Sequence, residues 1–194
     1  MRHVRLLPLC LLFVSAAAIA DDRADLLAHL QRTNDAFLAS VAGLTEAQWN
    51  YRAGEGRWTI AEVAEHIAAS EEMMLKGTLG VIQDNATPEA LKDARKDEML
   101  IQRIPDRTSR FQAPEVLRPT NRFGSAAGSV AAFRKSRAEM MALAKERPDL
   151  RNFAAPHPVT GNLDAHGWLL FQSAHSERHT KQIEEVKADP GFPK

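Results

Sequence analysis

The segment from Trp168 to Val186 constrains the fold most, because it places two histidines on the face of a helix that should point inward. In a helix of a bundle, residues spaced alternately by four and three lie on one seam facing the neighbouring helices. Counted from Trp168, this seam comprises Trp168, Gln172, His175, His179, Gln182 and Val186. Burying an imidazole without a partner is costly, and two of them on adjacent turns, roughly 6 Å apart along the axis, favour a shared partner such as a metal ion.

The rest of the chain has the apolar period of three further helices. We expect helix one over residues 22–43. Helix two begins after Thr59, because Thr59 and Glu62 have the spacing of a capping box, and helix three spans 125–146. Asn162 is the expected N-cap of the last helix.

Residues 85–124, between helices two and three, are rich in proline and charge and form a long insertion. Because Thr87-Pro88 is a typical helix start, we expect an amphipathic helix over 88–104, followed by an extended loop over 105–124. We find no convincing strand. The predicted fold is therefore all-α, an up-down four-helix bundle with a long, partly helical insertion between helices two and three. A connection of this length in a compact domain is usually a lid or a crossover.

The start of the chain has the organisation of a secretory signal peptide. A basic beginning precedes an apolar run, Leu6–Phe13, that is too short to span a bilayer, and Ala18-Ile19-Ala20 matches a cleavage site. We therefore predict a signal peptide over 1–20, a mature domain over 21–194, and a periplasmic or secreted location. The single cysteine, Cys10, lies in the signal, so the mature chain uses neither disulfides nor thiolate chemistry. No later apolar run reaches membrane-spanning length, so no stable membrane insertion is expected after the signal is removed.

Charge limits the classes of partner. The chain has 25 basic and 25 acidic residues, and two of the basic ones, Arg2 and Arg5, lie in the predicted signal. A near-neutral balance without a basic block argues against nucleic acid as a partner. We expect a small-molecule substrate, and a homodimer is compatible with the sequence.

The second helix supplies a third candidate metal ligand. Its inward seam comprises Val63, His66, Ser70 and Met73. His66, His175 and His179 could together bind a divalent ion and leave one coordination position open, as in a catalytic site. Such an ion would activate water or polarise a substrate carbonyl. The alternative is that the three are separately hydrogen-bonded core histidines.

The other polar residues of interest are assigned to simpler roles. We expect His29 and His166 to lie on the surface. His157 falls in a proline-rich turn, where we expect a structural role, with contact to substrate as the alternative. Asn34 falls at an inward position of helix one, where it would hydrogen-bond between helices or support a metal ligand.

Two segments match a known family signature. In residues 57–67, a tryptophan and a hydroxyl N-cap are followed seven residues after the cap by His66. The second match combines His157-Pro158 through Gly161 with residues 175–183, where a histidine pair is followed by glutamine. With these motifs, essentially the whole mature chain resembles the DinB-like superfamily. The resemblance implies an up-down four-helix bundle with a divalent ion, nickel or zinc, held by the three histidines His66, His175 and His179.

The resemblance also implies a function, because relatives include metal-dependent thiol transferases and hydrolases. The transferases act on cytoplasmic low-molecular-weight thiols, so predicted export favours an exported metal-dependent hydrolase-type enzyme that activates water on a small substrate. The alternatives are a non-catalytic metal-binding envelope or stress protein and a thiol-dependent S-transferase. The catalytic residues stay unassigned, because none of the polar residues expected near the ion is a strong base. These residues are Asn34, Ser70, Gln172 and Gln182.

Overall fold

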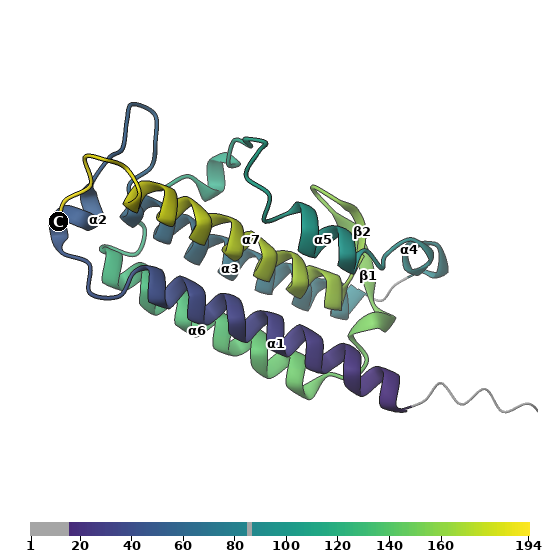
Figure 1. The fold of residues 1–194 in the computed structure, drawn as a ribbon. Coiled ribbons are helices and arrows are strands. Elements are labelled where there is room, and N and C mark those ends of the chain that lie inside the picture. The colour runs from purple at the N-terminus through teal and green to yellow at the C-terminus, as the bar shows by residue number, and fades with distance from the viewer. Residues whose placement is uncertain (1–15, 85–86) are drawn as a thin grey trace, which may run out of the picture.

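Four long helices form the body of the molecule (Figure 1). The structure is a computed structural model, and it describes residues 16–84 and 87–194. The long helices are α1 (Ala16–Ser40), α3 (Ile60–Asp84), α6 (Ala126–Glu146) and α7 (Ala165–Lys187). The all-α four-helix bundle expected from the sequence is therefore confirmed. The shorter elements are the helices α2 (Glu46–Asn50), α4 (Pro88–Lys92) and α5 (Asp97–Arg103), the 3-10 turns η1 (Glu115–Leu117) and η2 (Leu150–Asn152), and the strands β1 (Ala154–His157) and β2 (Gly161–Asp164).

Helix α1 packs on α6 and α7, and α3 packs on the same two helices. Lys187 near the end of α7 donates to the carbonyl of Ser40 at the end of α1 (3.2 Å), so these two helices run in parallel. Arg23 near the start of α1 reaches the carbonyl of Lys145 near the end of α6 (3.4 Å), so that pair is antiparallel. Helices α3 and α6 both run opposite to α1 in Figure 1, giving directions of up, down, down and up in chain order. The four-helix bundle is as predicted, but the directions do not alternate as the up-down order requires. Because α3 and α6 share a direction, a short loop cannot join them, and the insertion is the crossover that returns the chain.

The predicted capping box fixes the start of α3. Thr59 Oγ1 accepts from the Glu62 N–H (3.2 Å), and Glu62 Oε2 accepts from the Thr59 N–H (2.7 Å). Along the helix, Val63 and Ile67 are fully buried and belong to one apolar cluster with Ile183 of α7. Each such buried side chain contributes about 1.5–3 kcal/mol to folding. The predicted inward face of this helix is thus confirmed.

The insertion differs from the single helix predicted over 88–104. It forms two short helices, α4 and α5, with a break between them. Tertiary contacts explain the break: Lys96 donates to the carbonyl of Thr160 (2.9 Å), and Asp97 pairs with Arg151. These contacts stabilise a turn where the local apolar period alone favours a helix. The extended loop predicted over 105–124 is confirmed, apart from the short turn η1.

The connection before α7 is a β-hairpin, so the expected absence of strands is wrong. β1 pairs antiparallel with β2. The prolines of this segment hide a strand pattern, because proline lacks the N–H that a ladder requires. Asn162 lies within the hairpin opposite Pro156, and the N-cap of α7 is instead Asp164, whose Oδ1 accepts from the Gly167 N–H (2.6 Å).

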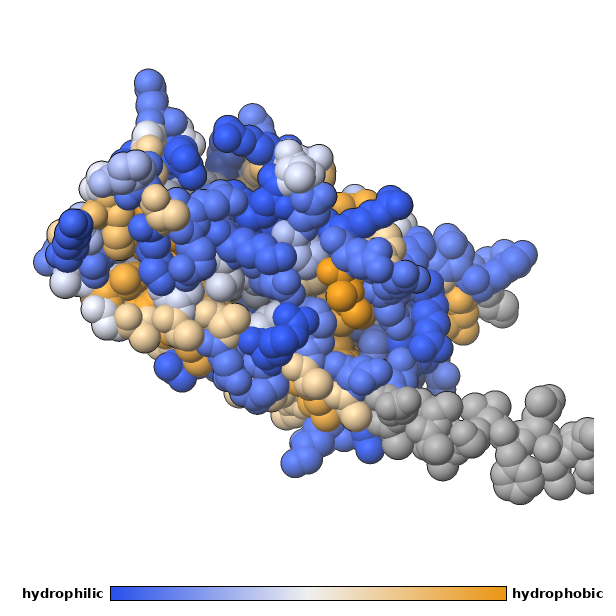
Figure 2. Space-filling model, in the orientation of Figure 1, coloured by the Kyte–Doolittle hydropathy of each residue, from blue (hydrophilic) through white to orange (hydrophobic). Residues whose placement is uncertain are grey.

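None of the helices in the described part of the chain is long and apolar enough to cross a membrane. The face drawn in Figure 2 is mostly hydrophilic, with hydrophobic atoms in scattered patches. Residues 1–15 of the predicted signal peptide lie outside the described residues. Cleavage after Ala20, the domain boundary at 21, the location and the homodimer therefore stay predictions.

Candidate metal centre

The structure brings together the three histidines that the sequence singled out. His66 comes from α3, and His175 and His179 come from adjacent turns of α7. One ligand nitrogen from each lies within 4.8 Å of the others. The ring centroids of His179 lie 4.5 Å from those of both His66 and His175. Both helices therefore present their histidines to one point.

A backbone carbonyl of the crossover orients His66. The Nδ1 of His66 donates to the carbonyl oxygen of Leu117 (2.9 Å). A carbonyl can only accept, so the neutral ring carries its proton on Nδ1 and leaves the lone pair on Nε2. The ring is only 2% exposed and packs beside Trp58 at 5.0 Å between centroids.

A side-chain amide orients His179 in the same way. The Nδ1 of His179 lies 2.8 Å from Oε1 of Gln182. Arg107 Nη1 approaches the same Gln182 atom at 3.4 Å, and because arginine can only donate, that atom is the amide oxygen. His179 must then donate from Nδ1, which again leaves the lone pair on Nε2.

His175 is the ligand candidate with an unsatisfied nitrogen. Its Nδ1 is buried and has no hydrogen-bond partner among the described residues. Ser70 Oγ, on α3, is also buried without a partner in that part of the chain. His175 stacks on Phe171 at 6.2 Å between centroids. A buried imidazole nitrogen without a partner costs free energy, so this arrangement favours a bound group.

Burial keeps all three imidazoles neutral. It lowers the pKa of His66 below the ordinary value of 6.5, lowers that of His175 well below it, and lowers that of His179 to about 3. Mutual repulsion between the protonated rings adds to the effect for His175 and His179. Neutral imidazoles are the form that binds metals, and imidazole suits zinc and nickel. The donor set therefore fits a divalent ion of this kind.

The DinB superfamily model matches residues 29–183, from within α1 to within α7. The chain belongs to the DinB superfamily. The uncharacterized protein YuaE of Bacillus subtilis (strain 168) is 27% identical over 154 residues, covering 76% of this chain and 88% of YuaE. A protein of Geobacillus thermodenitrificans (strain NG80-2) named "Putative metal-dependent hydrolase" is 36% identical over 66 residues, which cover 34% of this chain and 37% of that protein.

A solved structure shares the fold of this DinB-superfamily chain. YfiT from Bacillus subtilis is described as a probable metal-dependent hydrolase with an unusual four-helix bundle topology. It matches with a TM-score of 0.54 and 15% sequence identity, covering 88% of this chain and 89% of YfiT. At this identity the likeness shows the fold alone.

The buried carboxylate of Glu71, five residues after His66, is fully engaged. It forms a buried ion pair with Arg137 and also accepts from Ser176 Oγ (2.7 Å) and Gln172 Nε2 (3.2 Å). Glu71 is therefore a structural group and not a free base. Two of the polar residues expected near the ion are thus explained, because Gln172 holds Glu71 and Gln182 holds His179.

Asn34 does not have its expected inward position. Its side chain is partly exposed and bonds to its neighbour Asp35 (3.0 Å). The inward polar group on this part of α1 is Thr33, which is fully buried and lies 2.7 Å from Ser173 Oγ. The predicted roles of Asn34 are therefore wrong, because the buried face is rotated by one residue.

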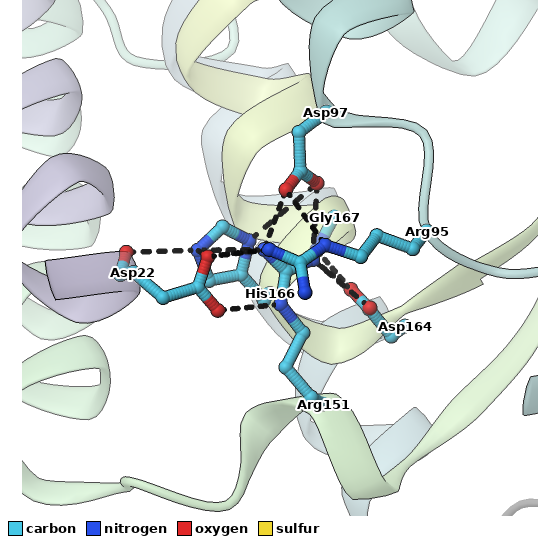
Figure 3. Close-up of polar contacts among 7 residues, drawn as sticks. All are labelled: Asp22, Arg95, Asp97, Arg151, Asp164, His166 and Gly167. Atoms are coloured by element: carbon cyan, nitrogen blue, oxygen red, sulfur yellow. Dashed lines mark hydrogen bonds and ion pairs between the residues drawn. The ribbon is translucent and has the colours of Figure 1, made fainter. Parts of the chain in front are cut away.

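Two histidines expected on the surface are buried. His29 is 7% exposed, with its Nδ1 2.7 Å from Ser173 Oγ, and burial lowers its pKa to about 4. His166 is 5% exposed and lies beside Arg151 (Figure 3). The surface prediction for His166 fails because α7 contacts α1, α3, α5, η2 and the hairpin, so more than one seam of it is covered. His29 on α1 is covered because Ser173 of α7 lies against it.

Figure 3 shows the ion cluster around Arg151, near the starts of α1 and α7. The Arg151 guanidinium bonds to Asp22 (2.8 Å), Asp97 (3.0 Å) and Asp164 (3.0 Å). These partners come from α1, α5 and the α7 N-cap, so one arginine joins three segments. The cluster fixes the end of the bundle where the described chain begins.

His157 has the structural role expected of it. It is 4% exposed, and its ring packs on Trp168 (4.7 Å) and Phe171 (4.2 Å). Its Nδ1 accepts from the Val159 N–H (3.2 Å), and burial lowers its pKa to about 4. Because Phe171 in turn stacks on His175, His157 supports the metal-ligand candidate through an aromatic ring.

Proposed function

We propose that this protein is an exported metal-dependent hydrolase-type enzyme, and that His66, His175 and His179 bind one divalent ion, nickel or zinc. The observation that carries the proposal is the convergence of three neutral imidazoles within 4.8 Å, two of them held in the tautomer with the lone pair on Nε2. Membership of the DinB superfamily and a relative named as a hydrolase support the reaction class.

Two residues of the chain orient the histidine rings of the proposed site. Leu117 and Gln182 hold the proton of His66 and His179 on Nδ1. When bound, a divalent ion supplies Lewis acidity and lowers the pKa of water toward neutrality. His175 and His179 are half-buried, whereas His66 is almost fully buried.

A second candidate function is non-catalytic metal binding, as in an envelope stress protein. The observation that favours it is the engagement of Glu71 by Arg137, Ser176 and Gln172, which leaves this buried carboxylate no freedom to move a proton. Turnover separates the two functions. The purified protein should be assayed for hydrolysis of small esters, amides and phosphate esters, with the His179→Ala variant as the matched control. Activity lost in that variant supports the enzyme, and no activity in the metal-loaded protein supports the binding protein.

Metal binding itself is tested by thermal unfolding with and without Zn²⁺ or Ni²⁺, on protein purified without a metal-affinity tag. At a free-metal concentration 100 times Kd, binding adds about 2.7 kcal/mol of stability, or roughly 5–11 °C in a domain of this size. His66→Ala, His175→Ala and His179→Ala should each remove most of this shift. His166→Ala should keep it, although it lowers the stability of the metal-free protein. An unshifted wild type would rule out the site.

Export is tested separately, by N-terminal sequencing of the native protein. The basic start, the apolar run and Ala18-Ile19-Ala20 support cleavage after Ala20, so the mature chain should begin at Asp21. Recovery of soluble protein that still begins with Met1 would contradict export.

A further inference from the structure

The residues that directly precede two of the proposed ligands both hold the crossover segment, which we define as residues 104–122. Glu65 precedes His66 on α3, and Arg178 precedes His179 on α7. Each is buried, at 5% and 7% exposure, and each bonds mainly to main-chain atoms of this one segment. The two ends of the segment are thus attached to the two helices that carry the histidines.

Glu65 binds three consecutive backbone N–H groups. Its carboxylate accepts from the N–H groups of Thr120 (2.7 Å), Asn121 (2.8 Å) and Arg122 (3.1 Å). Asn121 adopts a left-handed conformation, with φ of 60°, which is uncommon outside glycine. Such strain persists only where surrounding contacts stabilise it. The carboxylate therefore determines the path of the chain at this point.

The same clamp extends to the carbonyl that orients His66. Arg122 Nη2 donates to the carbonyls of Val116 (2.8 Å) and Arg118 (2.9 Å), which flank Leu117. The Leu117 carbonyl accepts the Nδ1 proton of His66. A chain of contacts therefore leaves α3 at Glu65, passes through Arg122 and the backbone around Leu117, and returns to α3 at His66.

Arg178 holds the other end of the segment. Its guanidinium donates to the carbonyls of Ile104 (3.4 Å), Asp106 and Ser109 and lies over the Phe111 ring, 5.2 Å from the centroid. Between those carbonyls lies Arg107.

Arg107 connects this end of the segment to the second proposed ligand, His179. It pairs with Glu185 through Nε (2.6 Å) and Nη2 (2.9 Å), and its Nη1 reaches the Gln182 oxygen at 3.4 Å. That oxygen accepts the Nδ1 proton of His179. Both clamps therefore lead to the Nδ1 proton of a ligand, whereas anchoring for stability alone requires no such link.

We propose that Glu65 and Arg178 are positioning residues of the metal site: by clamping the crossover segment, they hold in place the Leu117 carbonyl and the Gln182 amide that orient His66 and His179. This inference rests on the proposed function. Because coupling between two binding equilibria is reciprocal, metal binding should also order the segment. The crossover is then part of the metal site and not only a connection between α3 and α6.

The experiment is a Co²⁺ titration of the full-length mature protein, followed by visible absorption, which reports both Kd and coordination geometry. Glu65→Gln and Arg178→Lys should each weaken Co²⁺ binding by about 10–100-fold, the usual effect of removing support from a ligand. The matched control is Glu115→Gln, because Glu115 lies in the same segment with a side chain that is 91% exposed. This control should bind Co²⁺ as the wild type does.

Amide hydrogen exchange on the wild type gives a second measurement that needs no variant. Saturating Co²⁺ should slow exchange of the amides at 116–122 and leave those of the exposed turn at 54–56 unchanged. Wild-type affinity and spectrum in a folded Glu65→Gln protein would overturn the inference while leaving the metal site intact. Unchanged exchange in the metal-loaded wild type would also overturn it. If the wild type binds no Co²⁺, Zn²⁺ or Ni²⁺, the proposed metal site itself is refuted. This result differs from an unchanged affinity in Glu65→Gln or an unchanged exchange rate, which refute only the positioning role.

Discussion

Replacing Glu71 with glutamine should destabilise the protein severely, because Glu71 and Arg137 form an ion pair with side chains 0% and 1% exposed. The two carboxylate oxygens accept from Arg137 Nε (3.1 Å) and Nη2, from Ser176 Oγ (2.7 Å) and from Gln172 Nε2 (3.2 Å). Glutamine offers one oxygen and turns an NH₂ group toward these donors. It also leaves the guanidinium buried without its counter-charge.

Removing one partner of a buried ion pair costs about 3–5 kcal/mol. In a domain of this size, that cost lowers the melting temperature by about 6–20 °C. The assay is urea unfolding at pH 7 followed by circular dichroism, with the m value checked for constancy. The matched control is Arg32→Gln, which breaks the 3.1 Å pair with Glu177 on a side chain that is 56% exposed. This control should cost less than about 1 kcal/mol.

A double-mutant cycle then isolates the pair. Because apolar replacement of both partners leaves no unpaired charge, Glu71→Leu combined with Arg137→Met should cost less than the sum of the single changes, by about 1–3 kcal/mol. A loss below about 1 kcal/mol for Glu71→Gln, or strict additivity in the cycle, would show that the charge is not buried as described.

Three further predictions concern packing and pH. Ile67→Ala should cost about 2–5 kcal/mol in urea unfolding, because Ile67 is fully buried, and a loss under about 0.5 kcal/mol would contradict its placement. Gly77→Ala should destabilise the protein by about 1–3 kcal/mol, because the added Cβ would lie 2.6 Å from the Trp168 ring. Its control is Gly80→Ala on the same helix, where the added Cβ meets nothing within 4 Å and should stabilise the protein by up to about 1 kcal/mol. Burial lowers the pKa of His29 to about 4. As pH falls, the unfolded chain therefore takes up a proton at this residue near pH 6.5, before the folded protein does. The stability from this group is thus present above pH 6.5 and is lost as pH falls toward 4. His29→Asn should therefore flatten the pH dependence of the urea midpoint between pH 6.5 and 4, and an unchanged slope would contradict the assignment.

The long helices could be predicted because their signals are local. Thr59 and Ser125 precede apolar periods, and each side chain accepts an N–H three residues ahead (3.2 and 3.0 Å). The hairpin could not be predicted, because prolines interrupt the alternation that identifies a strand. The break between α4 and α5 depends on Lys96 and Asp97 meeting the hairpin and Arg151, which are distant in sequence.

The positions of the buried histidines show the limit of a periodic pattern. The inward seam of α7 correctly included His175 and His179, because α3 packs on that side of the helix. His166 lies off this seam and was expected to be exposed, yet Arg151 and the carbonyl of Asp22 cover it. A four-and-three spacing describes a helix with neighbours on one side, whereas α7 is also covered by α5 and η2.

The choice of candidate ligands and the tautomers of these histidines therefore depend on different information. Inward phase on two helices, together with the resemblance to the DinB-like superfamily, selected His66, His175 and His179 as candidate ligands, and the structure brings the three together. The tautomer of His66 depends on a carbonyl 51 positions away, and nothing in the sequence near Leu117 distinguishes it from other loop residues. That carbonyl lies in the stretch that Arg122 and Glu65 hold, so, as we propose, the residue beside a candidate ligand fixes its tautomer through a segment distant in sequence. For this reason we expect substitutions in the crossover segment to alter metal affinity even where they touch none of the three histidines.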